Sequence, residues 1–399
     1  MRRLLTATEA KALDRYTIGQ IGVPSVVLME RASLAVAGVC EELLCEVVAK
    51  EPDRKHILNR RTQMRILCVC AMGNNGADGV TVARILHLKG YRAEILLVGD
   101  EHKATDEMNI QLSIARNLGI GICKADEGEE YIKAGAYDIV VDAIFGVGLT
   151  REVTGIYAQL ICRINESGAK VVAVDIPSGI SADDGKIMGC AVKADVTVTF
   201  GNEKLGMILY PGTEYCGRKV IVDIGLAEEQ YLDGSTTAIT YDKSDMDRLP
   251  VRPAYSNKGT FGRVLVVAGS ENMGGAALFS GMAAYRMGAG LVEIATVAEN
   301  RSFLMERLPE CVLTIYSPEE KLESWLPKAV ERAKAVVVGP GMGIGKNTEK
   351  ILAFLLRKTD IPLIIDADGL NVLAGCFWSA PSPNRLGVTT TVSCWSLYP

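Results

Sequence analysis

Three features that many proteins carry are missing from this sequence, and each absence excludes a class of protein. No run of apolar residues approaches the ~20 that a membrane-spanning helix needs, and the first residues contain no apolar stretch of a secretory signal. Acidic residues outnumber basic ones, 48 to 43, whereas a general nucleic-acid-binding protein favours a basic surface. We therefore expect a cytoplasmic protein that interacts with neither membranes nor nucleic acids.

Common metal and nucleotide signatures are missing as well. None of the 11 cysteines belongs to a C-x-x-C pair, so their spacing does not indicate a metal or redox site. Cys68 and Cys70 alternate along an expected strand and are most simply reduced thiols of the core. The segment around Gly345 is no P-loop, because Pro340 and Asn347 stand where that motif requires glycine and serine or threonine.

The most informative segment that is present spans residues 67–79, with the sequence LCVCAMGNNGADG. A short apolar run indicates a buried strand, glycines then interrupt it, and a helical pattern resumes at residues 80–88. Backbone N–H groups converge on an anion at such a junction, and Asn74, Asn75 and Asp78 add oxygen atoms for a sugar, a cation or catalysis. The glycine spacing differs from the dinucleotide fingerprint G-x-G-x-x-G. The segment predicts a phosphate-bearing ligand, and a plain strand-to-helix turn is the alternative.

Strands and helices alternate along most of the chain, which predicts an α/β fold with parallel sheets. After a mostly helical segment at residues 8–48, the first series has expected strands at residues 65–71, 92–98, 138–143, 170–175, 195–199 and 219–223 and helices at 80–89, 105–118 and 155–166. A second series has strands at residues 263–268, 291–297, 312–316, 335–338 and 363–366, with a helix at 274–287. In such folds the ligand binds at the carboxyl ends of the strands.

A charged, proline-containing stretch near residues 235–255 predicts a boundary between two domains. We assign residues 1–235 to the first domain and 245–375 to a second, partial α/β domain. Residues 376–399 contain no Asp, Glu or Lys. This break in composition indicates a chain end unrelated to the preceding fold, such as a frameshifted or truncated reading, and a natural disordered tail is the alternative.

Two aspartates follow buried strands and precede glycine-containing loops. Asp142 begins the segment DAIFGVGLTR, and Asp175 begins DIPSG. A buried carboxylate at the end of a parallel strand is costly unless it binds something. Hard oxygen ligands suit a group I or II cation, an acid/base role is equally natural, and capping of the following turn is the third interpretation.

The first ~230 residues resemble the YjeF N-terminal family, the NAD(P)H-hydrate epimerases, which have a Rossmann-like three-layer fold. The matching motifs are Leu28-Met29-Glu30-Arg31-Ala32, Gly73-Asn74-Asn75-Gly76-Ala77-Asp78-Gly79, Arg84 with His87-Leu88, Asp142-Ala143-Ile144-Phe145-Gly146 and Asp175-Ile176-Pro177-Ser178-Gly179. One position departs from the family pattern, since Ala77 stands where the family usually has glycine.

This resemblance implies a hydrated NADH or NADPH as substrate, and it assigns roles to residues. Asp175 is the implied catalytic acid/base, and it also binds the substrate. Asn75, Asp142 and Ser178 are the implied ligands of a potassium ion. The other implied substrate contacts in this half are Asn74, Asn75, Gly76, Ala77, Asp78, Gly146, Val147, Gly148, Leu149, Thr150, Arg151 and Glu152.

The second half resembles the ribokinase-like ADP- or ATP-dependent NAD(P)H-hydrate dehydratases. The matching segments are Asn257–Arg263, Val267–Ser270, Gly274–Ala277, Gly288–Val292, Gly339–Gly343 and Asp366–Asn371. The resemblance implies ADP or ATP as a cofactor and Ala277 and Gly343 as substrate contacts. The family's later His-Pro-Gly-Glu and Gly-Thr-Gly-Asp segments are not in this sequence, so we expect the dehydratase half to be incomplete and inactive.

The predicted function is therefore repair of nicotinamide nucleotides, with epimerisation of the R and S hydrates as the activity of this chain. A non-catalytic ligand-binding or scaffold protein on the same fold is the alternative. The joint presence of Asn75, Asp142, Asp175 and Ser178 disfavours it, because a scaffold has no need of this oxygen cluster. A homo-oligomer is compatible with the sequence.

Overall fold

The computed structural model describes residues 2–49, 62–125, 132–227, 238–249, 251–358 and 361–375. The chain divides into two compact units, Met1–Leu249 and Pro250–Pro399. This division falls inside the boundary region expected from the sequence, while the exact domain limits of 1–235 and 245–375 stay predictions. The prediction for residues 376–399 concerns a segment outside the described residues.

The first unit is built on a seven-stranded parallel sheet with the order β4-β3-β2-β5-β6-β7-β9. Its strands are β2 (Arg65–Ala71), β3 (Arg92–Val98), β4 (Gly121–Lys124), β5 (Ile139–Ala143), β6 (Lys170–Val174), β7 (Val196–Phe200) and β9 (Arg218–Val222). Its longer helices are α1 (Ala7–Tyr16), α2 (Ser25–Ala49), α4 (Asn74–Leu88), α5 (Asp106–Asn117) and α6 (Gly155–Glu166). The predicted alternation of strands and helices is confirmed.

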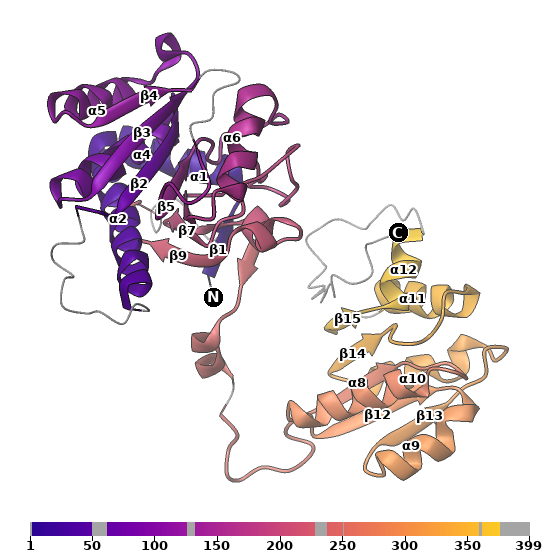
Figure 1. Ribbon diagram of the computed structural model, residues 1–399. Coiled ribbons are helices and arrows are strands. Elements are labelled where there is room, and N and C mark those ends of the chain that lie inside the picture. Colours follow the sequence, from indigo (N-terminus) through magenta and orange to yellow (C-terminus); the bar gives the residue numbers. More distant parts are fainter. Residues whose placement is uncertain are drawn as a thin grey trace. The chain divides into compact units, whose positions relative to one another are not determined.

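Helices cover both faces of this sheet, which gives three layers (Figure 1). Side chains of α2, α4 and α5 pack with Ile66, Cys68 and Cys70 on one face. Side chains of α6 pack with Leu67 and Val69 on the other. Strand residues therefore alternate between the two cores, as the period of a strand requires. Cys68 and Cys70 are buried and free, which agrees with their interpretation as core thiols.

A second, small sheet lies beside the main one and was not expected from the sequence. It has the order β10-β1-β8, in which β1 (Arg2–Leu5) pairs in parallel with β8 (Glu203–Lys204) and antiparallel with β10 (Ala238–Thr240). These strands are two to four residues long, too short for a readable alternation. The sheet fixes the chain that leads into α1, whose first turn is held by a capping box between Thr6 and Glu9.

One prediction about the glycine segment was wrong. The helix does not begin at residue 80 but at Asn74, so both asparagines lie in its first turn. The reason is close packing against the sheet. A β-carbon on Gly76 would lie 1.7 Å from the carbonyl oxygen of Ala71, and one on Gly79 would lie 2.4 Å from the β-carbon of Ala143. These glycines are needed for contact between helix and strands rather than for a loop.

The second unit is a five-stranded parallel sheet with the order β13-β12-β11-β14-β15. Helices α8 and α9 pack on one face, and helices α10, α11 and α12 pack on the other. The strands are β11 (Arg263–Val267), β12 (Leu291–Thr296), β13 (Val312–Ile315), β14 (Ala335–Val338) and β15 (Leu363–Ile365). The helices are α8 (Gly274–Arg286), α9 (Arg301–Arg307), α10 (Leu326–Arg332), α11 (Lys346–Lys358) and α12 (Asp368–Gly375). Both units thus confirm the α/β class.

Within the described residues, every helix is too short or too polar to cross a membrane.

Candidate active site

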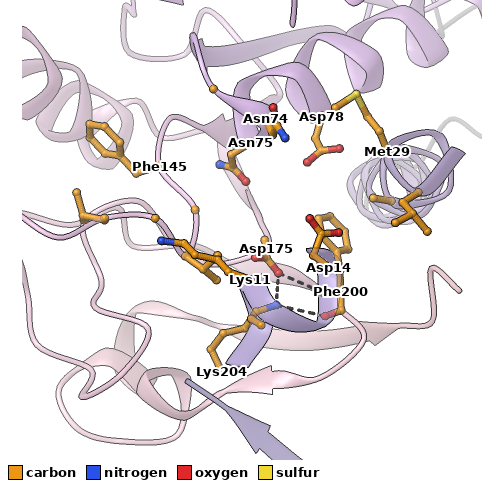
Figure 2. A pocket seen from close by; sticks show the side chains of 18 of the residues that line it. Lys11, Asp14, Met29, Asn74, Asn75, Asp78, Phe145, Asp175, Phe200 and Lys204 are labelled. Atoms are coloured by element: carbon orange, nitrogen blue, oxygen red, sulfur yellow. Dashed lines mark hydrogen bonds and ion pairs between the residues drawn. The ribbon is translucent and has the colours of Figure 1, made fainter. Parts of the chain in front are cut away.

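A cavity of about 630 Å³ opens at the carboxyl ends of the central strands of the first unit. Residues that follow β2, β5 and β6 form part of its wall, as expected for a parallel sheet. Helices α1 and α2 contribute further residues, as do the end of β7, β8 and the segment after β9. Figure 2 shows the polar side chains of this wall converging from several elements.

Most of the predicted substrate contacts of the first unit line this cavity. They are Asn74, Asn75, Asp78, the six residues of the Gly146–Arg151 segment, and Asp175. Gly76 and Ala77 do not line the cavity, because they are buried in helix α4 against the sheet. Glu152 does not line the cavity either. Ala277 and Gly343 lie in the second unit. The substrate-binding roles of all these residues remain predictions.

Asp175 is held in an unusual backbone conformation, with a φ of 66°. Left-handed backbone costs a non-glycine residue of order 1–3 kcal/mol, although aspartate tolerates it better than most, and such strain clusters at functional sites. The Asp175 backbone N–H donates to the carbonyl oxygen of Val198 at 2.8 Å. The main chain thereby turns the carboxyl group of Asp175 toward the cavity wall (Figure 2).

A buried ion pair joins the Asp175 carboxylate to the ammonium group of Lys204 in β8. The carboxylate also accepts hydrogen bonds from Thr199 Oγ1 and from the Phe200 backbone N–H, both at 3.2 Å. Lys204 is 2 % exposed and also donates to Thr199 Oγ1 at 2.9 Å. Sequence analysis missed Lys204, because a lone lysine after an expected strand carries no signal of its partner.

Asp142 forms a second buried cluster with Ser178. Its carboxylate accepts a hydrogen bond from Ser178 Oγ at 2.6 Å and from the Ser178 backbone N–H at 2.8 Å. It also accepts from the backbone N–H of Ile144 at 3.3 Å, so the predicted capping role is present. Burial raises the pKa of Asp142 to about 6, against the lowering effect of these hydrogen bonds.

Asn75 and the Phe145–Gly146 segment adjoin this cluster. The Phe145 backbone N–H donates to Ser178 Oγ at 2.8 Å. A β-carbon on Gly146 would lie 3.2 Å from Asn75 Oδ1, so glycine allows the asparagine to approach the loop. The Asn75 amide nitrogen is buried and has no hydrogen-bond partner among the residues that the structure describes. The predicted ligands Asn75, Asp142 and Ser178 thus lie together around one loop.

Two residues of helix α1, Lys11 and Asp14, also line the cavity. The pKa of Asp14 is raised by burial and then by the negative charges of Asp175 and Glu107. The pKa of Asp78 is raised well above its usual range, chiefly by burial and further by Asp175 and Asp14. Sequence analysis missed Lys11 and Asp14, because charged residues on an amphipathic helix are ordinarily solvent-facing.

Replacing Lys204 by methionine tests the buried ion pair. We expect Lys204→Met to lower the free energy of unfolding of the first unit by about 3–5 kcal/mol, because it leaves a buried carboxylate without its counter-charge. Lys11→Met is the matched control: Lys11 lines the same cavity, and within the described part of the chain no carboxylate pairs with it. Its effect is expected within about 0.5 kcal/mol.

Urea unfolding of the full chain measures this difference. All three tryptophans follow residue 250, so their fluorescence reports on the second unit alone, while far-ultraviolet circular dichroism reports on both. Only the circular dichroism transition of the first unit is expected to move. Equal losses for the two variants would show that the ion pair adds no particular stability.

Comparison with known proteins identifies the family of the chain. The family model "YjeF-related protein N-terminus" matches residues 25–206, and the model "NAD(P)H-hydrate dehydratase" matches residues 264–382. The bifunctional NAD(P)H-hydrate repair enzyme Nnr of Thermofilum pendens is 33% identical over 389 residues, which are 94% of this chain and 70% of the relative. The NAD(P)H-hydrate epimerase of Oenococcus oeni is 44% identical over 225 residues, 56% of this chain and 97% of the relative.

Among solved structures, a crystal structure of the yeast protein ynu0 matches with a TM-score of 0.44 and 25% identity, covering 51% of this chain and 82% of that one. The two family models follow each other along the chain in the order of the two units. The two family models and the relative from Thermofilum pendens confirm the resemblance found in the sequence motifs. The chain belongs to the family of bifunctional NAD(P)H-hydrate repair enzymes.

Proposed function

We propose that the first unit epimerises the R and S forms of hydrated NADH and NADPH in the cavity described above. The observation that carries this proposal is the Asp175–Lys204 pair, held on strained backbone at the cavity wall. The relative from Oenococcus oeni, which this chain matches over nearly the whole length of that relative, is named an NAD(P)H-hydrate epimerase. A scaffold protein would have no use for a carboxylate held in this costly way.

The cavity has groups suited to each part of a dinucleotide. The N-terminus of helix α4, capped by Gly73, presents free backbone N–H groups that favour a diphosphate. Lys11 and Arg151 line the same cavity as cations, and neither is in an ion pair within the described ranges. Apolar side chains such as Met29 and Phe145 offer a surface for the rings.

Asp175 is the proposed catalytic base. Inversion at the hydroxyl-bearing carbon requires a base that removes a proton from the substrate, such as that of the hydroxyl group, and later returns it. Lys204 keeps the Asp175 carboxylate in place and balances its charge. Thr199 and the Phe200 backbone N–H fix the orientation of the carboxylate by hydrogen bonds.

We further propose that the cluster of Asn75, Asp142 and Ser178 holds a potassium ion. The fit is supported by the chemistry of the donors: a carboxylate, a hydroxyl and an amide oxygen around one loop suit a hard monovalent cation. Asp142 is fully buried, and no cationic side chain pairs with it among the described residues. A bound cation would neutralise this carboxylate and fix the Phe145–Gly146 segment against the substrate.

The second unit belongs to the dehydratase family by its sequence match. We propose that it binds ADP or ATP and that Ala277 and Gly343 contact the hydrate there. Gly343 lies near the start of α12, since its backbone N–H donates to Asp368 Oδ2 at 2.8 Å. The two motifs named above are missing from this sequence, so we expect no dehydration by this chain. A cytoplasmic location and homo-oligomer formation also remain predictions.

Asp175→Asn is expected to reduce epimerisation by about 10²–10⁴-fold, the usual contribution of a general base. Asparagine tolerates left-handed backbone and keeps one oxygen for the hydrogen bonds. Because the substitution also leaves the buried Lys204 without its counter-charge, far-ultraviolet circular dichroism checks that the variant is folded. The assay follows conversion between purified R and S hydrates after subtraction of the uncatalysed rate. The control is Asp247→Asn, an exposed carboxylate outside the cavity. Wild-type turnover by Asp175→Asn would remove Asp175 from the mechanism.

The dehydratase prediction is tested on the same purified chain with mixed R and S hydrates. We expect conversion between the hydrates and no recovery of NADH absorbance when ATP or ADP with magnesium is added. The matched reaction without nucleotide sets the baseline. NADH recovery that depends on nucleotide would show that the second unit is active without the two missing motifs.

Exchange of potassium for tetramethylammonium at equal ionic strength tests the cation site. The larger ion does not fit between close oxygen donors, so KM for the hydrate is expected to rise in the wild-type chain. Asp142→Asn removes the charge that attracts the cation, and its KM should be the same in both salts. A wild-type KM that is independent of the salt would leave Asp142 with a capping role alone.

A further inference from the structure

Helix α1 places a third carboxyl group in the cavity, from a segment that precedes the family match at residues 25–206. Asp14 of α1, Asp78 of α4 and Asp175 after β6 all line the same space. Figure 2 shows Asp78 and Asp14 extending toward one another from facing helices, with Asp175 beside them. Three carboxyl groups around one cavity repel each other if all are ionised.

The three groups differ in their surroundings. Asp175 has the ammonium of Lys204 and two further hydrogen-bond donors. The carboxyl groups of Asp78 and Asp14 make no hydrogen bond or ion pair in the part of the chain that the structure describes. Asp175 thus has a counter-charge and two hydrogen-bond donors, whereas the Asp78 carboxyl has neither among the described residues.

We propose that Asp78 is the general acid of the epimerisation and that Asp14 is the positioning residue that keeps Asp78 protonated. This inference rests on the proposed function of the cavity. It gives the site an acid and a base at the same time, both at the wall of one cavity. An acid and a base acting together on two atoms suit the opening of a ring better than either group alone.

The titratable groups that face Asp78 agree with this assignment. The negative charges of Asp175 and Asp14 both raise the pKa of Asp78, in addition to its burial. Cys70 of β2 lies near Asp78. The pKa of its thiol is raised chiefly by burial and further by the negative charges of Asp142 and Asp78, so Cys70 adds no charge beside Asp78. The cations that line the cavity are Lys204, which is paired with Asp175, together with Lys11 and Arg151. Burial and the two neighbouring negative charges therefore all favour the protonated form of Asp78.

The proposed step conserves every atom and involves no oxidation. The Asp175 carboxylate takes the proton of the hydroxyl group, and the hydroxyl-bearing carbon becomes a carbonyl as its bond to the ring nitrogen breaks. The electron pair of that bond goes to the ring nitrogen, which receives the proton of Asp78. Rotation about the adjacent single bond exposes the other face of the carbonyl. The nitrogen then attacks it, returns its proton to Asp78, and the oxygen recovers its proton from Asp175.

The test measures kcat and KM of the full chain against pH, with the R hydrate of NADH as substrate. We expect Asp78→Asn to lower kcat by about 10²–10⁴-fold with little change in KM. We expect Asp14→Asn to move the basic limb of the kcat/KM profile to lower pH, because loss of a negative charge lets Asp78 release its proton more readily. Asp247→Asn should keep the wild-type profile, and thermal unfolding checks that each variant is folded.

Two results would overturn the inference while the proposed function stands. One is an Asp78→Asn variant whose KM rises while its kcat is retained, which would make Asp78 a binding group only. The other is an Asp14→Asn variant whose basic limb stays at the wild-type pH. Asp14 lines the cavity and is not a core residue, so this second variant decides the question even where Asp78→Asn fails to fold. A wild-type chain without epimerase activity would instead reject the proposed function.

Discussion

The Asp175–Lys204 ion pair is the interaction on which the candidate site depends. A buried carboxylate is costly without a counter-charge, and this one also sits on left-handed backbone. Lys204 reaches it because β8 pairs with the N-terminal strand β1, and β1 pairs in turn with β10. The small sheet therefore fixes the position of Lys204, while the large sheet carries the carboxylate of Asp175.

Charge is distributed unevenly around the cavity. Carboxyl groups gather where α1, α4 and the end of β6 meet, and cations lie on α1, in β8 and on the loop after β5. The start of helix α4 adds the partial positive charge of its free N–H groups. A ligand with a diphosphate and a polar, uncharged ring matches this distribution. Gly76 and Gly79 allow the start of α4 to lie at the cavity, because they let this helix pack close to the sheet.

The buried Asp142–Ser178 cluster has a different character. It lies beneath the loop after β5 rather than in the cavity wall. Its hydrogen bonds join the ends of β5 and β6, so it sets the position of the loop that lines the cavity. A cation there would act on the substrate through the loop. Two buried carboxylates at strand ends are thus stabilised differently: Asp142 accepts hydrogen bonds from Ser178, whereas Asp175 forms an ion pair with Lys204.

The sequence by itself determined the α/β class, most strands and helices, and the segments that carry Asn75, Asp78, Asp142 and Asp175, because periodicity and glycine spacing are local properties. Only the tertiary structure revealed Lys204, Asp14 and Lys11, and the start of α4 at Asn74. Lys204 donates to Asp175, and the charge of Asp14 raises the pKa of Asp78, although the members of each pair lie on segments far apart in the chain. Pairing of short strands and packing of a helix over a cavity leave no local pattern that a sequence could display.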